Sequence, residues 1–187
     1  MSGAKPIALR GIFPPIPTPM TNDGDVDYGH LQQNLEKWNT EPMDGYVVLG
    51  SNGEYVYLST DERLDTIRAA RDAIPSDRLL IAGAGMESTR ATIGLAIRMA
   101  ELGADLAIIV TPHYYNSKMT AAALEQHYRH VADACPIPII LYNVPLFTGV
   151  NIPAETVITL AKHPNIAGIK ESSSDVGKLG MMLDRVP

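Results

Sequence analysis

Short apolar segments rich in β-branched residues recur along the chain roughly every 30 residues, the length of one strand–helix unit. These segments lie at residues 11–17, 45–50, 79–83, 105–110, 137–143 and 166–170. Each is apolar throughout and does not alternate with polar residues, as is typical of parallel strands that are covered on both faces. The pattern therefore predicts six parallel strands.

The segments between these strands have helical spacing and carry N-terminal caps. Ser59 with Glu62 forms a capping-box pattern, in which each side chain satisfies a backbone N–H of the first turn. Ser88 and Thr120 can cap the next two helices, and Pro153 suits a first helical turn. Predicted helices cover residues 28–38, 60 onward, 88–101, 121–134, 153–162 and 175–185.

Strict alternation of strands and helices defines an α/β protein with a parallel sheet, either a doubly wound sheet or a (β/α)₈ TIM barrel. The length of chain per strand–helix unit matches that of a barrel. A complete barrel typically needs about 250 residues, however, and this chain has 187. We therefore expect one domain over residues 1–187. It would contain the first six β–α units of a barrel, with strands 7 and 8 and the C-terminal helices absent.

Composition narrows the class of protein further. The formal charge is −6 without any basic run, which disfavours nucleic acid and anionic membranes as partners. The only cysteine, Cys135, cannot form an internal disulfide, and no apolar stretch is long enough to span a membrane. The first ten residues lack the apolar core of a signal peptide. A cytoplasmic protein is expected, and a mitochondrial location stays open.

In a barrel the C-terminal ends of the strands build the active site, and the sixth predicted strand ends in Lys170. A lysine at the end of a buried strand is partly desolvated, which lowers the pKa of its amine. A neutral amine can attack a ketone and form an imine, which accepts electrons during C–C cleavage. A lysine that reaches past the strand end into solvent is an equally good interpretation of this position alone.

Other strand ends supply hydroxyl and amide groups. Tyr142 ends the strand next to that of Lys170 and is an acid/base candidate, or a core tyrosine. Ser51 and Asn52 lie in a turn between glycines, where they can bind a carboxylate or simply shape the turn. Tyr115, with its neighbour Tyr114, suits an active-site loop or an oligomer contact. No strand end offers a cluster of metal ligands, so no metal is expected.

Taken together, these segments resemble the dihydrodipicolinate synthase/N-acetylneuraminate lyase superfamily of pyruvate-dependent class I aldolases, also called DapA-like. The resemblance extends along the whole chain. It rests on Pro-Thr-Pro-Met (17–20), Gly-Ser-Asn-Gly-Glu (50–54), Thr-Pro-His-Tyr-Tyr (111–115), Tyr-Asn-Val-Pro…Thr-Gly (142–149) and Gly-Ile-Lys-Glu-Ser (168–172).

The resemblance implies a role for each matching residue. Lys170 corresponds to the Schiff-base lysine, Tyr142 to the tyrosine that carries protons, and Ser51 to the hydroxyl that relays them. Ser51 and Asn52 correspond to the turn that binds the pyruvate carboxylate. Tyr115 corresponds to a tyrosine that reaches the neighbouring subunit's site. Such proteins are homo-oligomers, dimers or tetramers, and their reaction requires no cofactor.

Two departures from the synthase pattern favour a particular subfamily. Synthases usually place two threonines where this chain has Ser51 and Asn52, and an arginine in the stretch that here reads Leu-Phe-Thr-Gly (146–149). Phe147 cannot replace an arginine that grips a carboxylate. The chain looks most like a 4-hydroxy-2-oxoglutarate aldolase, which cleaves its substrate to pyruvate and glyoxylate. In that group the serine two residues after the lysine, here Ser172, also belongs to the site.

Several alternatives remain at this point. The chain resembles 4-hydroxy-tetrahydrodipicolinate synthase or another pyruvate aldolase nearly as well, and a truncated, non-catalytic paralogue or interaction fragment is an alternative of another class. A metal-dependent aldolase is disfavoured because His127 and His130 share a helix face that we expect to face solvent. A nucleotide-binding sheet is disfavoured because the glycines at 83 and 85 lack a third at the right spacing.

Overall fold

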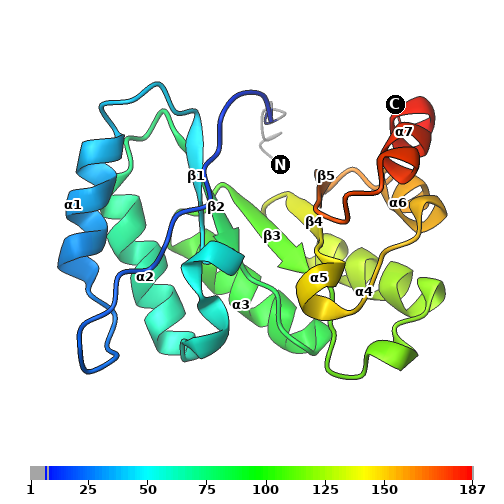
Figure 1. Ribbon diagram of the computed structural model, residues 1–187, viewed down its shortest axis with the longest axis horizontal. Helices are drawn as coiled ribbons and strands as arrows, with labels where there is room; N and C mark the ends of the chain where they lie inside the picture. Colours follow the sequence, from blue (N-terminus) through cyan, green and yellow to red (C-terminus); the bar gives the residue numbers. More distant parts are fainter. Residues whose placement is uncertain (1–6, 8, 187) are drawn as a thin grey trace.

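The computed structural model of the protein describes residue 7 and residues 9–186. Its sheet has five parallel strands whose spatial order is the order of the chain (Figure 1). A doubly wound sheet reverses its strand order at a switch point, whereas a barrel adds each new strand to the same edge. The strands are β1 (Gly45–Val48), β2 (Leu79–Gly83), β3 (Leu106–Val110), β4 (Ile139–Asn143) and β5 (Ile166–Glu171).

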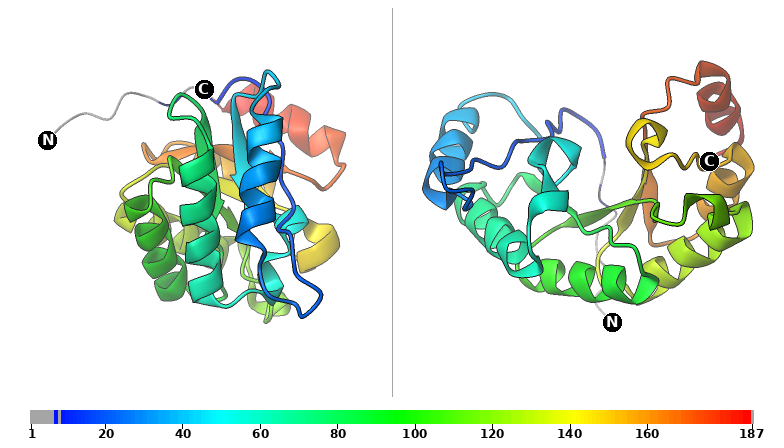
Figure 2. Two further views of the ribbon diagram at one scale, coloured as in Figure 1. Left: turned by 90° about the vertical axis from the view of Figure 1, so that its left-hand side faces the viewer. Right: turned by 60° about the horizontal axis from the view of Figure 1, so that its bottom comes forward.

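The main helices follow one another along the outside of this sheet, which gives the molecule the crescent shape visible in Figure 2. The fold is thus a partial TIM barrel. Within residues 7 and 9–186, no helix combines the length and apolarity needed to cross a membrane. The helices are α1 (Tyr28–Trp38), α2 (Thr60–Ala73), α3 (Thr89–Glu101), α4 (Ala121–Ala134), α5 (Pro145–Thr148), α6 (Ala154–Leu160) and α7 (Val176–Arg185).

The caps that the sequence predicts are present. Ser59 and Glu62 form the complete capping box at the start of α2, and Ser88 and Thr120 each accept a backbone N–H at the start of their helices. Asp175, predicted as the first residue of the last helix, is instead the cap of α7 and accepts the Lys178 N–H. The helix predicted over residues 153–162 is shorter, because α6 spans Ala154–Leu160 and its cap residue lies outside it. The short helix α5, directly after β4, was not predicted.

The prediction of a strand at residues 11–17 is wrong. This segment runs extended beside β1 and forms only an isolated parallel bridge, Pro15 with Val47. The Ile16 N–H donates to the Val47 carbonyl at 3.0 Å, and the Val47 N–H donates to the Pro14 carbonyl at 3.0 Å. Three prolines among seven residues lack the N–H that a ladder requires.

The expectation that all strands are covered on both faces is also wrong at β5. Strands β1, β3 and β4 are buried along their whole length, whereas no residue of β5 is fully buried and Ala167 is exposed. Among the described residues β5 pairs only with β4, so its other edge is open. The apolar side chains that point into the barrel form a cluster separate from the core beneath the helices, and this inner cluster borders the open edge.

Two histidines on α4 have different environments, so one part of the sequence interpretation is wrong. His130 is exposed, as expected. His127 is only 6% exposed, and its ring Nδ1 is hydrogen-bonded to the Thr89 hydroxyl on α3 at 2.9 Å. His127 and His130 lie on one side of α4, as helical spacing predicts. The neighbouring helix α3 covers the part of that side where His127 lies.

The burial of His127 predicts an acid-sensitive contribution to stability. Desolvation lowers the pKa of this ring from 6.5 to about 4. Between these values the unfolded chain binds a proton that the folded chain does not, so the free energy of unfolding falls as the pH falls from 6.5 to 4. The loss is on the order of 3 kcal/mol for a shift of this size. Urea unfolding at pH 7, 5 and 4 measures it.

A matched pair of variants isolates this contribution. We expect His127→Gln to flatten the decrease between pH 7 and pH 4, because glutamine does not titrate. His130→Gln, on the exposed side of the same helix, should leave the decrease unchanged. Equal pH dependence in the two variants would contradict the assignment.

Candidate active site

Three of the predicted site residues lie together where β1, β4 and β5 end. The register of the sheet pairs Tyr142 with Lys170, and the Lys170 Nζ lies over the Tyr142 ring, 4.4 Å from its centre. On the other side of the tyrosine, its hydroxyl is hydrogen-bonded to the Ser51 hydroxyl at 2.9 Å. The result is a continuous path from a serine through a buried phenol to a half-buried amine.

Ser51 is positioned by a tight turn after β1. Leu49, the first residue after β1, is buried with φ of +60°, a left-handed conformation that is uncommon for leucine. Residues 51–53 then form a 3₁₀ turn. The buried Thr18 hydroxyl donates to the Gly53 carbonyl at 2.7 Å. This hydrogen bond connects the Pro-Thr-Pro-Met segment to the turn. Thr18 was not singled out from the sequence, although its motif was.

The turn has no room to move towards β2. A Cβ atom added at Gly83 would lie 1.9 Å from the Leu49 carbonyl oxygen, which is backbone and cannot rotate away. We therefore expect Gly83→Ala to lower the free energy of unfolding by about 2 kcal/mol, as overpacking does elsewhere. It should also displace the Ser51 turn. Urea denaturation measures the first effect.

A second glycine provides the control for this prediction. A Cβ at Gly94, in the middle of α3, meets nothing within 4 Å. We expect Gly94→Ala to raise the free energy of unfolding by up to about 1 kcal/mol, because alanine is the better helix former. The contact with Leu49 would be refuted if Gly83→Ala were as stable as the unsubstituted chain.

The other predicted site residues make no direct contact with this group. Asn52 is exposed in the turn next to Ser51. Ser172 is exposed just after β5, and its N–H continues the sheet by donating to the Asn143 carbonyl at 2.9 Å. Tyr115 is 70% exposed and packs edge-to-face on Tyr114, with ring centroids 5.0 Å apart. Their roles in binding or catalysis remain predictions.

Glu87, which the sequence interpretation missed, organises the loop that carries the tyrosine pair. One carboxylate oxygen accepts the backbone N–H groups of His113 at 3.0 Å and of Tyr114 at 2.9 Å. The other oxygen lies 3.1 Å from the His113 ring. Because this contact joins loops 26 residues apart, no local sequence pattern could have revealed it.

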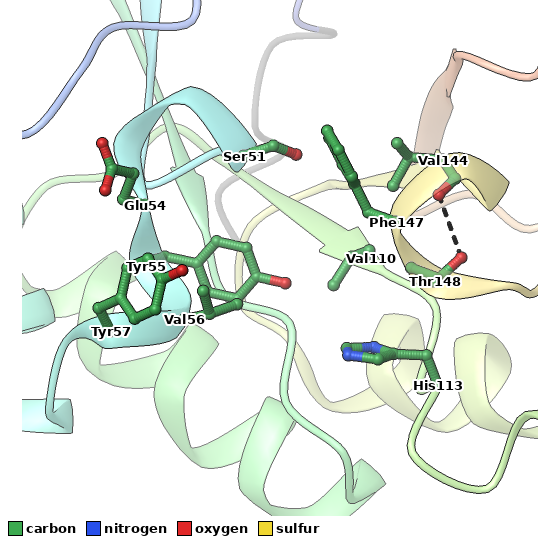
Figure 3. A pocket seen from close by; sticks show the side chains of 10 residues that line it. All are labelled: Ser51, Glu54, Tyr55, Val56, Tyr57, Val110, His113, Val144, Phe147 and Thr148. Atoms are coloured by element: carbon green, nitrogen blue, oxygen red, sulfur yellow. Dashed lines mark hydrogen bonds between the residues drawn. The ribbon is translucent and has the colours of Figure 1, made fainter.

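A cleft of about 430 Å³ opens beside the Ser51 hydroxyl. Figure 3 shows one wall formed by the segment after β1 and the other by Val144 and α5, with Val110 at the end of β3 and His113 just after it. The Ser51 hydroxyl points across towards Phe147. Lys170 instead lines a cavity of about 480 Å³ inside the open barrel. Tyr142 contacts one residue of each space, because its hydroxyl is hydrogen-bonded to Ser51 and its ring packs on Lys170. The cleft is lined by Ser51, Glu54, Tyr55, Val56, Tyr57, Val110, His113, Val144, Phe147 and Thr148.

The side chains that converge in this region suit proton transfer and covalent chemistry. In the part of the chain that the structure describes, no three His, Cys, Asp or Glu side chains gather in a way that could hold a metal ion. The groups that converge are an amine, a phenol and an aliphatic hydroxyl. Such groups can form a covalent bond to a carbonyl carbon and move protons around it.

Comparison with known proteins agrees with this fold. The model of the dihydrodipicolinate synthetase family matches residues 8–186, and the chain belongs to this family. Curated relatives include the 4-hydroxy-tetrahydrodipicolinate synthase of Haloarcula marismortui, 37% identical over 96% of this chain and 58% of the relative. The synthase of Exiguobacterium sibiricum is 40% identical over 96% of this chain and 60% of its own length.

Solved structures agree at the level of the fold. The dihydrodipicolinate synthase of Acinetobacter baumannii, complexed with pyruvate, superposes with a TM-score of 0.91 at 37% identity, over 96% of this chain and 61% of that one. A prophage protein of the same family from E. coli K12, also with pyruvate, gives 0.90 at 32% identity, with coverages of 96% and 60%. The chain thus spans about three-fifths of the length of these relatives.

Proposed function

We propose that this chain carries the imine-forming centre of a pyruvate-dependent class I carbon–carbon lyase. The observation that carries the proposal is the path from Ser51 through Tyr142 to Lys170 at the C-terminal ends of the strands. Two relatives whose structures contain pyruvate support it. In this proposal Lys170 is the nucleophile, Tyr142 carries protons and Ser51 relays them.

The chemistry follows from these groups. The turn at Ser51 and Asn52 would seat the carboxylate of a 2-oxo acid, with Ser172 as a further polar contact. The neutral Lys170 amine attacks the keto carbon, and loss of water gives an imine. Loss of a proton from the adjacent carbon, or cleavage of its bond to a hydroxyl-bearing carbon, then gives an enamine. Tyr142 takes up and returns the proton, and hydrolysis releases the free lysine.

Condensation in the manner of a 4-hydroxy-tetrahydrodipicolinate synthase is the leading candidate for the whole reaction. The names of the similar curated proteins support it, and they favour it over the 4-hydroxy-2-oxoglutarate aldolase to which the sequence motifs pointed. In this reaction the enamine of pyruvate adds to an aldehyde that also carries a carboxylate.

Cleavage of 4-hydroxy-2-oxoglutarate to pyruvate and glyoxylate is the second candidate. The observation that favours it is Phe147, which lines the cleft and is 68% exposed. It lies in the stretch where synthases are expected to supply an arginine for the aldehyde's carboxylate. A phenyl ring offers no hydrogen-bond donor to that group. Because glyoxylate also carries a carboxylate, this argument rests on the departure from the synthase pattern and not on carboxylate binding as such.

The open edge of β5 supports a further part of the proposal, that full activity requires the two β–α units that close a barrel. An open edge leaves backbone groups of β5 and the inner cavity accessible to solvent. The exposed pair Tyr114 and Tyr115 supports assembly into a homo-oligomer, with Tyr115 reaching the neighbouring subunit's site.

Borohydride trapping with pyruvate tests the proposal. The reagent reduces an imine to a stable amine, and peptide mass spectrometry locates it. We expect a pyruvate adduct on Lys170 and on no other lysine. A chain that is folded by circular dichroism but forms no adduct would overturn the proposal and favour the non-catalytic alternative. Detection of glyoxylate released from 4-hydroxy-2-oxoglutarate, or of 4-hydroxy-tetrahydrodipicolinate formed from pyruvate, then separates the two reactions.

A further inference from the structure

A buried ion pair lies on the face of β5 opposite to the candidate nucleophile. Consecutive residues of a strand point to opposite faces, so Lys170 faces the interior of the barrel and Glu171 faces the outer layer of helices. There Glu171 Oε2 lies 2.7 Å from the Nζ of Lys178 on α7. The two side chains are only 8% and 7% exposed.

Two asparagines connect this ion pair to the neighbouring strand. The Asn143 side-chain amide donates to Glu171 Oε1 at 2.7 Å and to Asn151 Oδ1 at 2.9 Å. The Lys178 ammonium donates to Asn151 Oδ1 at 2.8 Å. We call these four residues the Glu171 network. It joins β4, β5, the segment before α6, and α7.

The network holds Glu171 in its charged form. Burial acts to raise the pKa of this carboxyl, but hydrogen bonds from Lys178, Asn143 and Ser173 outweigh it and keep the pKa below its ordinary value. A buried ion pair tolerates little displacement, because desolvation is offset only when the contacts are close and complete. Displacement of either partner would leave a buried charge with weaker compensation, so the pair favours the observed arrangement of β5 and α7.

The Glu171 network lies directly next to the candidate site along both β4 and β5. Asn143 directly follows Tyr142, and Glu171 directly follows Lys170. The sheet register pairs Asn143 with Glu171 just as it pairs Tyr142 with Lys170. Because β5 has only one strand neighbour among the described residues, the side chains at its C-terminal end add to the backbone ladder with β4 that holds its alignment.

We propose that the Glu171 network is a positioning device that holds Lys170 over the Tyr142 ring. Its members contact the opposite face of the sheet and touch no reacting group. Its effect on catalysis rests on the function proposed above, whereas its effect on the placement of Lys170 does not. No sequence pattern in the chain pointed to these four residues as a unit.

A second ion pair provides the matched control. Glu155 on α6 and Arg185 on α7 also connect this part of the chain, with one contact at 3.0 Å. The Glu155 side chain is 65% exposed and that of Arg185 is 46% exposed, in contrast to the buried pair. Comparison of Glu171→Gln/Lys178→Met with Glu155→Gln/Arg185→Met separates a specific positioning effect from a general loosening of α7.

The first measurement is the rate of borohydride trapping as a function of pyruvate concentration and pH. In the network variant we expect the maximal rate to fall about tenfold, the scale of a small misplacement of a reacting group. The half-saturating pyruvate concentration should change less than about twofold, because the Ser51 turn is untouched. The control variant should match the unsubstituted chain in both quantities at every pH.

The second measurement needs no pyruvate. Acetic anhydride labels amines, and peptide mass spectrometry compares Lys170 with the exposed Lys162. We expect labelling of Lys170 relative to Lys162 to rise about fivefold in the network variant, because its amine is released from the tyrosine ring, and to stay constant in the control. If the unsubstituted chain forms no imine, the proposed function is refuted. The labelling of Lys170 then tests by itself whether the Glu171 network holds this side chain in place.

Three outcomes would overturn the inference: unchanged labelling of Lys170 in the network variant, an unchanged maximal trapping rate, or an equal loss in the control. If the double variant does not fold, Asn151→Ser takes its place. That change removes the oxygen shared by Asn143 and Lys178 and leaves the ion pair in position. The same criteria then apply, with a smaller expected change.

Discussion

Replacement of Lys170 by arginine is expected to abolish the pyruvate adduct and to lower turnover by about 10⁵-fold, as loss of a covalent nucleophile does in other enzymes. Arginine keeps the positive charge and a similar length, but its guanidinium stays protonated at any working pH and cannot form the imine. Borohydride trapping followed by peptide mapping measures the adduct, and a coupled pyruvate assay measures turnover.

The control is the same substitution at Lys162, an exposed residue just after α6. We expect Lys162→Arg to trap pyruvate at the rate of the unsubstituted chain. An adduct that persists in Lys170→Arg would move the nucleophile to another lysine. An adduct that disappears from both variants would point to a general loss of structure, which circular dichroism would reveal.

Removal of one hydroxyl, in Tyr142→Phe, is expected to lower turnover by about 10²- to 10⁴-fold, the usual contribution of general acid–base catalysis. The ring that lies under the Lys170 Nζ remains, so pyruvate binding should change little. The hydrogen bond to Ser51 is lost, and with it the proton path to the cleft. Steady-state kinetics should therefore show a fall in kcat with a nearly constant KM.

A second buried tyrosine serves as the control. Tyr128, on α4, donates its hydroxyl to the Ile109 carbonyl at 3.1 Å and is fully buried. We expect Tyr128→Phe to lower the free energy of unfolding by about 1 kcal/mol and to leave turnover unchanged. Full turnover by Tyr142→Phe would exclude this phenol as the proton carrier.

Local features of the molecule could be predicted from the sequence because they depend on residues a few positions apart. The box formed by Ser59 and Glu62 and the apolar runs of β1 to β5 are of this kind. The lysine and tyrosine at strand ends could also be found, because parallel strands end at one side of a sheet. The failures at residues 11–17, at β5 and at His127 share one cause: each depends on what lies beside the segment rather than within it.

The sequence by itself determined the alternation of strands and helices, the helix starts, and the residue types available for imine chemistry. Tertiary structure alone decided which of those residues meet. Ser51 and Tyr142 are hydrogen-bonded although they are 91 residues apart. Glu171 contacts Lys178 because the pleat of β5 directs the Glu171 side chain towards α7. Such contacts follow from strand register and burial, which are set by packing summed over the whole sheet, whereas caps and periodicity are set within one or two turns of chain.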